Sequence, residues 1–306
     1  MQTILGANGQ IAEELTRELY RTYTQDIRLV SRKPQKIHET DQLGAANLLD
    51  AQATEKAVEG SEIAYLTVGL PMDSQLWEEQ FPPIMQNVIN ACKKQRCKLV
   101  FFDNTYMYPK TDEPQTENSP FVPVGRKAAV RARIAPMLLA EMSANTIEAV
   151  ICRAPEFYGP GKTQSLTNSM IFDNIRQGKK LRVPLSATTF RTLIWTPDAS
   201  RAMARIGNTP DAYGQTWHLP CDDNRLTYKG LIAFASRICH RELTYSVLPM
   251  PIFTLGGFFN QQLKEVQELL PRYTRDNLFI STKFKERFPG FAVTTYQEGM
   301  TQILNG

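Results

Sequence analysis

Hydrophobic and polar positions follow two alternating periods along the first half of the chain. Short apolar runs rich in β-branched residues are typical of buried strands, and they lie at 3–5, 27–31, 62–68, 98–103 and 147–153. Between them, apolar residues recur every three or four positions, which predicts helices at about 51–59, 77–94 and 124–142. This alternation predicts βαβ units and therefore an α/β fold with a doubly wound parallel sheet.

The second half of the chain is less regular, because prolines divide it into shorter segments and predict turns there. Helical periodicity continues in five stretches, at 166–177, 197–206, 227–239, 260–270 and 295–304. We expect a first domain over residues 1–153 and a smaller C-terminal α+β lobe over 154–306, with the chain able to cross between them.

The turn after the first strand carries the most informative motif, GANGQIA at residues 6–12. Gly6 permits a backbone conformation closed to residues with a Cβ, and Gly9 lets the main chain approach a pyrophosphate at the positive end of the next helix. Ala12 stands where a third glycine usually allows close packing. The turn predicts a dinucleotide site in a Rossmann-type domain, with candidate contacts Gly6, Asn8, Gly9, Gln10 and Ile11.

Charge and composition narrow the choice of partners. The chain has 35 Lys and Arg against 31 Asp and Glu, a net charge of +4. This excess is small and evenly spread, so we expect no nucleic-acid partner and no membrane partner. The longest apolar runs have strand length, and we expect neither a signal peptide nor a membrane span. A small-molecule substrate is the expected partner.

The cysteines indicate the redox environment. Five cysteines lack CxxC spacing, and only three histidines accompany them. We therefore expect structural thiols in a reducing compartment, the cytoplasm, and no metal site. GxSxG, HExxH and EF-hand patterns are absent, and the GPGKT string at 159–163 has Glu156 where a P-loop needs glycine, so neither hydrolase nor triphosphatase chemistry is expected.

In order and spacing, several segments resemble the short-chain dehydrogenase/reductase superfamily, in its extended and atypical branches of the NAD-dependent epimerase/dehydratase type. They are GANGQIA at 6–12, NLLD at 47–50, TVGLP at 67–71, FFDNTYMYP at 101–109, RAPEFYGPG at 153–161 and FRTLIWTPDASRA at 190–202. The resemblance implies a nicotinamide dinucleotide, a substrate-binding second lobe, and a monomer or a homodimer formed through helices 77–94 and 124–142.

In this resemblance the end of the second strand faces the adenosine ribose. An acidic residue there would bind the ribose hydroxyl of NAD, whereas this chain has Ser31, Arg32 and Lys33. A guanidinium can pair with a 2′-phosphate through two hydrogen bonds, so we expect NADP rather than NAD. The alternative interpretation is a solvated basic turn. The resemblance also places Asn47 and Leu48 beside the adenine, and Val68, Gly69 and Leu70 along the cofactor.

The catalytic pair of the superfamily is missing. Its Tyr and Lys are spaced YxxxK on one helix, so that the ammonium lowers the pKa of the phenol. Here Val124 and Ala128 stand at those positions. The strings from Tyr106 to Lys110 and from Tyr158 to Lys162 contain prolines and cannot be helical.

Other residues near the end of the fifth strand could supply the chemistry. Asn104 takes the place of the family's Ser or Thr, and Thr105 follows it. Strand alternation would put Tyr106 and Tyr108 on one side, where either phenol could replace the missing tyrosine; simple packing is the alternative. A cation could come from the following helix, from Arg126, Lys127 or Arg131, although charges on a helix usually form its solvated face.

Two functions follow from this sequence. The first is an NAD(P)-dependent oxidoreductase or epimerase/dehydratase-like enzyme acting on a small molecule, in which an unconventional residue moves the proton. The second is a non-catalytic NAD(P)-binding regulator or redox sensor, since the dinucleotide turn is kept while the catalytic pair is lost. Aromatic residues of the second lobe favour a small-molecule ligand and hence the enzyme: Phe157, Tyr158, Phe190 and Trp195.

Overall fold

The computed structural model describes residues 1–161, 163 and 165–305, and the chain forms two compact units. Unit 1 comprises Met1–Met107, Arg126–Ala154 and Ala199–Leu219. Unit 2 comprises Tyr108–Gly125, Pro155–Asp198 and Pro220–Gly306. The chain therefore passes between the units several times. The expected domain division after residue 153 stays a prediction.

Unit 1 is built on a parallel sheet of seven strands in the order β11-β6-β5-β4-β1-β2-β3. The strands are β1 Gln2–Leu5, β2 Ile27–Ser31, β3 Gln42–Ala45, β4 Ile63–Leu66, β5 Lys98–Asp103, β6 Ala149–Arg153 and β11 Thr216–His218. The order reverses direction between β1 and β4, as in doubly wound folds that bind ligands at this point. The expected fold class is confirmed.

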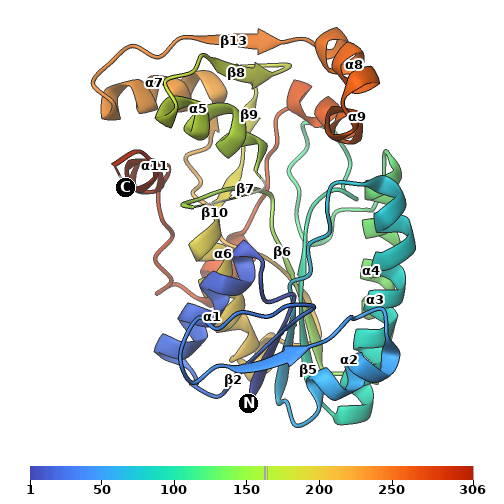
Figure 1. Cartoon of the computed structure of the whole chain (residues 1–306). Helices are drawn as coiled ribbons and strands as arrows, with labels where there is room; N and C mark the ends of the chain where they lie inside the picture. Colours follow the sequence, from blue (N-terminus) through green and yellow to red (C-terminus); the bar gives the residue numbers. More distant parts are fainter. Residues whose placement is uncertain (162, 164, 306) are drawn as a thin grey trace. The chain divides into compact units, whose positions relative to one another are not determined.

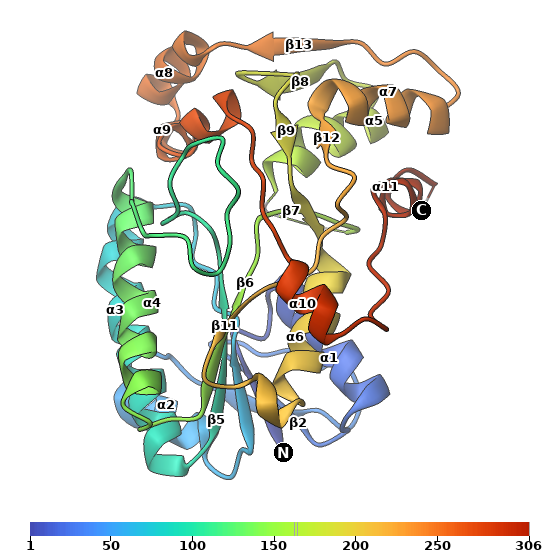
Figure 2. The ribbon, with the colours of Figure 1, turned by 180° about the vertical axis from the view of Figure 1, so that it is seen from behind.

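Five helices cover the two faces of this sheet. They are α1 Gln10–Thr22, α2 Ala51–Val58, α3 Ser74–Gln95, α4 Arg126–Ser143 and α6 Thr196–Gly207. Helices α2, α3 and α4 lie on one face, and α1 and α6 on the other (Figures 1 and 2). Because both faces are covered, central strands are apolar throughout, as in β4, where all four residues are buried.

Side-chain caps fix where the helices next to β3 and β4 begin. The carboxylate of Asp50 accepts the Ala53 amide at the start of α2, and that of Asp73 accepts the Leu76 amide at the start of α3. Each cap binds an amide that the first helical turn leaves without a partner. α2 begins at Ala51, where the sequence pattern predicts it, and α3 begins at Ser74, three residues before its predicted start.

Unit 2 contains short elements around a second apolar core. Three two-stranded sheets pair β7 with β10, β9 with β12 and β8 with β13. These strands are β7 Glu156–Tyr158, β8 Leu181–Pro184, β9 Phe190–Arg191, β10 Leu193–Trp195, β12 Leu226–Thr227 and β13 Tyr245–Leu248. The helices are η1 Asn168–Phe172, α5 Asp173–Arg176, α7 Tyr228–Ile238, α8 Met250–Phe259, α9 Gln261–Gln267, η3 Leu270–Thr274, α10 Thr282–Arg287 and α11 Tyr296–Asn305; η2 Pro210–Ala212 belongs to unit 1.

Helix α8 is the main element that the sequence pattern did not predict. Its apolar residues do not form a single stripe, because Leu255, Phe258 and Phe259 are exposed whereas Phe253 is buried. The predicted helix 166–177 is also irregular, since its central part is a π-helix, η1. In the part of the chain that the structure describes, no helix is both long enough and apolar enough to cross a membrane.

Candidate functional site

Gly6 joins β1 to the turn in a conformation that requires glycine. Its φ is +101°, and an added Cβ would lie 2.8 Å from the Val68 backbone nitrogen. The Gly6 amide donates to the Val30 carbonyl, 2.9 Å away. Gly6 thus lets the turn lie against the backbone that follows β4, while its amide is bound to β2.

Gly9 ends the turn and is the N-cap of α1, without a side-chain cap. An added Cβ would meet only the Gly6 carbonyl oxygen, at the ordinary contact distance of 3.5 Å. The space beyond Gly9 is therefore open. It lies next to the backbone amides of the first helical turn, for which the helix itself offers no hydrogen-bond acceptor. An open cradle at the positive end of a 13-residue helix fits a pyrophosphate.

Asn8 connects the glycine turn to the loop after β2. Its Nδ2 donates to the Lys33 carbonyl at 2.8 Å, and its Oδ1 accepts from the Ser31 hydroxyl at 3.3 Å. Arg32, between these two residues, is exposed. Its guanidinium makes no hydrogen bond or ion pair within residues 1–161, 163 and 165–305. Arg32 is thus held beside the turn by its neighbours, with its cation available.

The other candidate cofactor contacts differ in their surroundings. Leu48 is buried in the core, whereas Asn47 is exposed and its side chain accepts the Leu49 amide at 3.2 Å. Gly69 has no neighbour within 4 Å of an added Cβ, and Val68 and Leu70 pack against the core. Contacts of these residues with a cofactor stay predictions.

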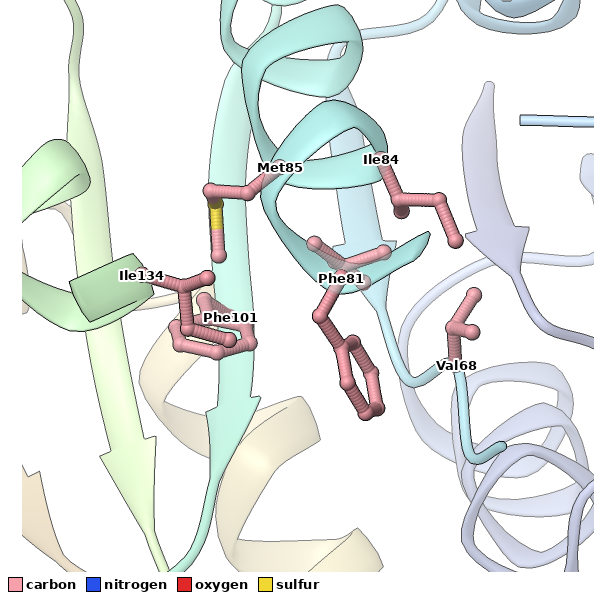
Figure 3. A pocket seen from close by; sticks show the side chains of 7 residues that line it. Val68, Phe81, Ile84, Met85, Phe101 and Ile134 are labelled. Atoms are coloured by element: carbon pink, nitrogen blue, oxygen red, sulfur yellow. The ribbon is translucent and has the colours of Figure 1, made fainter. Parts of the chain in front are cut away.

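A small apolar cavity lies behind this loop (Figure 3). Side chains from β4 and the loop after it, and from β5, α3 and α4, converge on it: Leu66, Val68, Phe81, Ile84, Met85, Phe101 and Ile134. Its volume of about 10 Å³ is at the lower limit for one water molecule, and the lining is apolar. We conclude that the cavity is a packing gap and that Val68 directs its side chain away from a polar ligand.

Beyond β5 the chain turns at once. Asn104 Oδ1 accepts the Tyr106 amide at 3.0 Å, and the Tyr106 ring stacks on Trp77 with centroids 6.0 Å apart. The Asn104 amide nitrogen and the Thr105 hydroxyl donate no hydrogen bond to the described residues. Both therefore retain a donor for a ligand at the carboxyl end of the sheet.

The strand argument that grouped Tyr106 with Tyr108 is wrong. β5 ends at Asp103, so both tyrosines lie in the turn that follows and strand alternation does not apply to them. Tyr106 belongs to unit 1 and Tyr108 to unit 2, where Tyr108 is buried and its ring lies 6.1 Å from that of Phe121. Tyr158 lies in unit 2, where it ends β7.

The two positions of the missing catalytic pair do not share a helix. Val124 is exposed and precedes α4, whereas Ala128 is buried on it. Between them Gly125 has a φ of +100°, which ends the extended segment before the helix begins. Lys110 is not a substitute for the missing lysine, because it donates to the Val124 and Glu268 carbonyls. The other YxxxK string ends at Lys162, outside the described residues.

Two of the three candidate cations on α4 are buried, which corrects the expectation of a solvated face. Arg126 is exposed and pairs with Glu78. Lys127 is fully buried, and its ammonium donates to the Ser74 hydroxyl at 2.7 Å. Arg131 is also buried, and its Nη1 lies 3.6 Å from Asp103 Oδ1.

Arg131 is one of the candidate cations named from the sequence, but its contacts were not predicted. Its guanidinium lies 4.3 Å from the Phe81 ring centroid and 5.1 Å from that of Trp77, the residue on which Tyr106 stacks. Burial lowers the pKa of Arg131, and the nearby Asp103 and Tyr106 partly oppose this shift. Unit 1 therefore holds a buried arginine, paired with Asp103, on the same tryptophan as the candidate phenol.

Asp103 also binds a second arginine. Its Oδ2 accepts from Arg153 Nε at 3.1 Å, and both side chains are buried. The carboxylate at the end of β5 is thus shared by Arg131 of α4 and Arg153 at the end of β6. Among the described residues, no group of three or more His, Cys, Asp or Glu is placed to hold a metal ion, and each of the five cysteines is a free thiol.

Comparisons with solved structures show the fold of the chain. UDP-glucuronic acid 4-epimerase from Bacillus cereus, in complex with UDP-glucuronic acid and NAD, has a TM-score of 0.80 at 13% identity and covers 100% of this chain and 98% of its own. UDP-glucose 4-epimerase from Thermus thermophilus, in complex with NAD, gives 0.78 at 14%, covering 100% and 98%. DesIV, a dTDP-glucose 4,6-dehydratase from Streptomyces venezuelae with NAD bound, gives 0.77 at 14%, covering 100% and 96%.

Sequence comparisons identify the family. The protein y4nL of Sinorhizobium fredii is 26% identical over 170 residues, which are 54% of this chain and 47% of the relative. The chain thus spans about half the length of that curated relative. The family description that matches residues 3–219 is "NAD dependent epimerase/dehydratase family". The match begins at β1 and ends at β11, so it contains the glycine turn and the whole parallel sheet, and the chain belongs to the NAD-dependent epimerase/dehydratase family.

Proposed function

We propose that this protein is an NAD(P)-dependent oxidoreductase of the epimerase/dehydratase type that acts on a small molecule. The observation that carries the proposal is the turn from Gly6 to Gly9, where the backbone packs on the β4 loop and leaves an open cradle at the start of α1. Membership of the family and the NAD bound by similar structures support it.

In this proposal the residues of unit 1 divide the work. The first turn of α1 binds the pyrophosphate through backbone amides, and Asn8 holds the neighbouring loop in place. A bound nicotinamide dinucleotide supplies the hydride chemistry. Asn104 and Thr105 orient a substrate oxygen with their available donors.

Tyr106 is the proposed proton donor and acceptor. It follows β5 in unit 1, and Trp77 fixes its ring in a stacked position. Arg131 lies over the same tryptophan, with its guanidinium 5.1 Å from the ring centroid. Tyr108, the other candidate, packs in unit 2 with 1% of its surface exposed, and we assign it a packing role.

A regulator or redox sensor is the second candidate function. The observation in its favour is that Val124 and Ala128 replace the catalytic pair and do not share a helix.

The free thiols of all five cysteines fit the proposed cytoplasmic location. As to assembly, we propose a monomer or a homodimer formed through α3 and α4.

Calorimetric titration with NAD, NADH, NADP and NADPH tests the proposed function directly. We expect at least one of the four to bind at micromolar concentrations and to raise the melting temperature. A screen of NADPH oxidation against quinones, aldehydes and keto-sugars then separates enzyme from sensor. Binding without turnover of any substrate would favour the sensor, and failure of all four dinucleotides to bind would overturn both functions.

Arg32→Ala is expected to remove most of a preference for NADP(H) over NAD(H). A charge-assisted pair with the 2′-phosphate contributes about 1 to 3 kcal/mol, so the variant should bind NADP(H) about 5- to 150-fold more weakly. Affinity for NAD(H) should stay unchanged. Arg17→Ala, which removes an exposed cation of α1 that pairs with Glu14, is the matched control. Equal affinities of the wild-type protein for both cofactors would contradict the assignment.

A further inference from the structure

Helix α8 of unit 2 exposes large apolar side chains to solvent. Phe258 and Phe259 have 78% and 93% of their surface exposed, and Leu255 has 62%. Together with two neighbours they form an apolar patch, which consists of Ile252, Leu255, Phe258, Phe259 and Leu263. Gathered apolar side chains on a protein surface mark sites that bind a membrane or another protein. The apolar patch is therefore a candidate binding surface.

Helix α8 is apolar on two sides, and one of them packs inside unit 2. Phe253 and Gly257 are buried four positions apart, and Gly257 lies against α9. Ile252, Leu255 and Phe259 follow the i, i+3, i+7 spacing of a single helix face, and all three are exposed. A helix that is apolar all round is typical of surroundings without water. The exposed side of α8 therefore fits an apolar environment outside unit 2.

The backbone where α8 meets α9 is already hydrogen-bonded within the protein. The Asn260 amide donates to the Gly256 carbonyl at 2.9 Å, and Asn260 Oδ1 accepts the Leu263 amide at 3.1 Å. The Lys264 amide donates to the Asn260 carbonyl, also at 3.1 Å. Transfer of this junction out of water therefore costs little, because the penalty falls mainly on polar groups without a partner.

The elements next to α8 are basic. Residues 173–184 and 228–267, from α5 to β8 and from α7 to α9, carry eight Lys and Arg against three Asp and Glu, a net charge of +5. Since the whole chain has a net charge of +4, its positive charge is concentrated in these segments rather than evenly spread. All eight cations are exposed, among them Lys179, Lys180 and Arg182.

These basic segments and the apolar patch belong to one part of unit 2. Strand β8, which follows Lys180, pairs with β13 along its length, and β13 leads directly into α8 (Figures 1 and 2). Val183 of β8, Leu231 of α7 and Phe253 of α8 pack in the same apolar core. An anionic lipid surface offers a partner for both features, since its headgroups attract cations and its acyl chains accept apolar side chains.

A second copy of the chain fits this surface less well. In a two-fold symmetric dimer the same patch of each protomer meets its counterpart. The eight cations near each patch would then come close to the eight of the other protomer, and like charges across an interface repel. Charge complementarity therefore favours an anionic bilayer over a second copy.

We propose that the apolar patch and the basic segments beside it bind the surface of a bilayer that contains anionic lipids, with Phe258 and Phe259 inserted among the headgroups. Such binding at the surface needs no membrane-spanning helix. The proposal replaces the expectation of no membrane partner, which is based on the net charge of the whole chain. It concerns unit 2 alone and does not depend on the proposed function.

Co-sedimentation of the full chain with lipid vesicles tests the proposal. We expect binding to vesicles of equal parts phosphatidylcholine and phosphatidylserine to be at least about tenfold stronger than binding to vesicles of phosphatidylcholine alone. High salt should weaken this binding, because it screens the attraction between cations and headgroups. No binding to either kind of vesicle would overturn the proposal, and equal binding to both would overturn the part assigned to the cations.

Two double variants separate the apolar contribution from the charge. Phe258→Ser, Phe259→Ser should bind the mixed vesicles at least about tenfold more weakly, since burial of one phenyl ring already contributes that much to an affinity. Phe190→Ser, at an exposed phenylalanine of β9, is the matched control and should bind normally. Lys179→Gln, Lys180→Gln should weaken binding to the mixed vesicles about tenfold or more.

The control for the lysines removes two exposed cations of unit 1. Arg17→Gln, Arg21→Gln, on α1, should bind the mixed vesicles as the wild type does. All these side chains are exposed, so the melting temperatures should change little. Loss of binding in either control as large as in its partner variant would overturn the assignment to this surface.

Phe258→Trp provides a second measurement on a protein that keeps the apolar patch. The three native tryptophans are buried, so the added indole is an exposed reporter. We expect its emission to shift to shorter wavelength with the mixed vesicles, and an unchanged spectrum would contradict insertion. Sedimentation velocity distinguishes the other occupant: a wild-type dimer that dissociates in Phe258→Ser, Phe259→Ser would show that the patch binds a second copy, and would overturn the proposal.

Discussion

Gly9→Val is expected to abolish dinucleotide binding while the protein stays folded. The backbone of Gly9, with φ −88° and ψ 152°, suits valine, and the added Cβ meets only an ordinary contact at 3.5 Å. The valine methyl groups would instead fill the space that the pyrophosphate needs. Loss of two charge-assisted hydrogen bonds, at about 1.5 to 3 kcal/mol each, weakens binding about 100-fold or more. Calorimetric titration with the preferred cofactor measures this loss.

Two further variants are compared with Gly9→Val to interpret its loss of cofactor affinity. Gly290→Val places the same side chain at an exposed position with no neighbour within 4 Å, and should bind the cofactor normally. Gly6→Ala should instead destabilise unit 1 by about 2 to 5 kcal/mol, because the residue has φ +101° and its Cβ would lie 2.8 Å from Val68 nitrogen. Unchanged cofactor affinity in Gly9→Val would show that the pyrophosphate lies elsewhere.

The sequence predicted the sheet of unit 1 well because that sheet is buried on both faces. Strands such as β5 are then continuous apolar runs, and its predicted range, 98–103, is the observed one. The helical periodicity of the sequence also predicted α2 and α3, whose first turns are capped by the local side chains of Asp50 and Asp73. Local signals of this kind are readable without knowing which residues meet in space.

The catalytic region was harder to predict because it depends on contacts between distant segments. Asn104 ends β5 by accepting the Tyr106 amide, and a strand argument carried past this turn gave the wrong relation between Tyr106 and Tyr108. Arg131 was one of three candidate cations, but its place beside Trp77, 54 positions earlier in the chain, was not predictable. One sequence signal existed: Arg131 lies in the apolar stripe of α4, where a solvated cation is not expected.

In unit 2, the ion pairs of Glu156 with Arg191 and Arg272 were equally hard to predict, because they also join distant segments. The two arginines lie 35 and 116 positions after the glutamate, on β9 and η3. The motif RAPEFYGPG contains the glutamate, but nothing local shows that the side chain is buried and ionised. Tertiary packing decides which distant charges pair, and neither composition nor periodicity shows that packing.

Whether the protein is an enzyme depends on the Tyr106 phenol, which lies near the buried Arg131 guanidinium. Arg131 is desolvated between two aromatic rings, so its charge acts on Tyr106 with little screening by water. In our proposal Arg131 is a positioning and electrostatic residue, and the proton itself moves at the Tyr106 oxygen.

Tyr106→Phe is therefore expected to lower kcat by about 100- to 10,000-fold on any substrate that the NADPH screen identifies, because general acid-base assistance is of that size. Cofactor affinity and melting temperature should change little, since the phenyl ring can still stack on Trp77. Tyr245→Phe, at a half-buried tyrosine of β13, is the matched control and should keep full activity. Activity that survives in Tyr106→Phe but is lost in Tyr108→Phe would move the proton transfer to Tyr108, and activity that survives in both would show that neither phenol takes part. A rise in KM at constant kcat in Tyr106→Phe would mean that the hydroxyl binds substrate without transferring its proton.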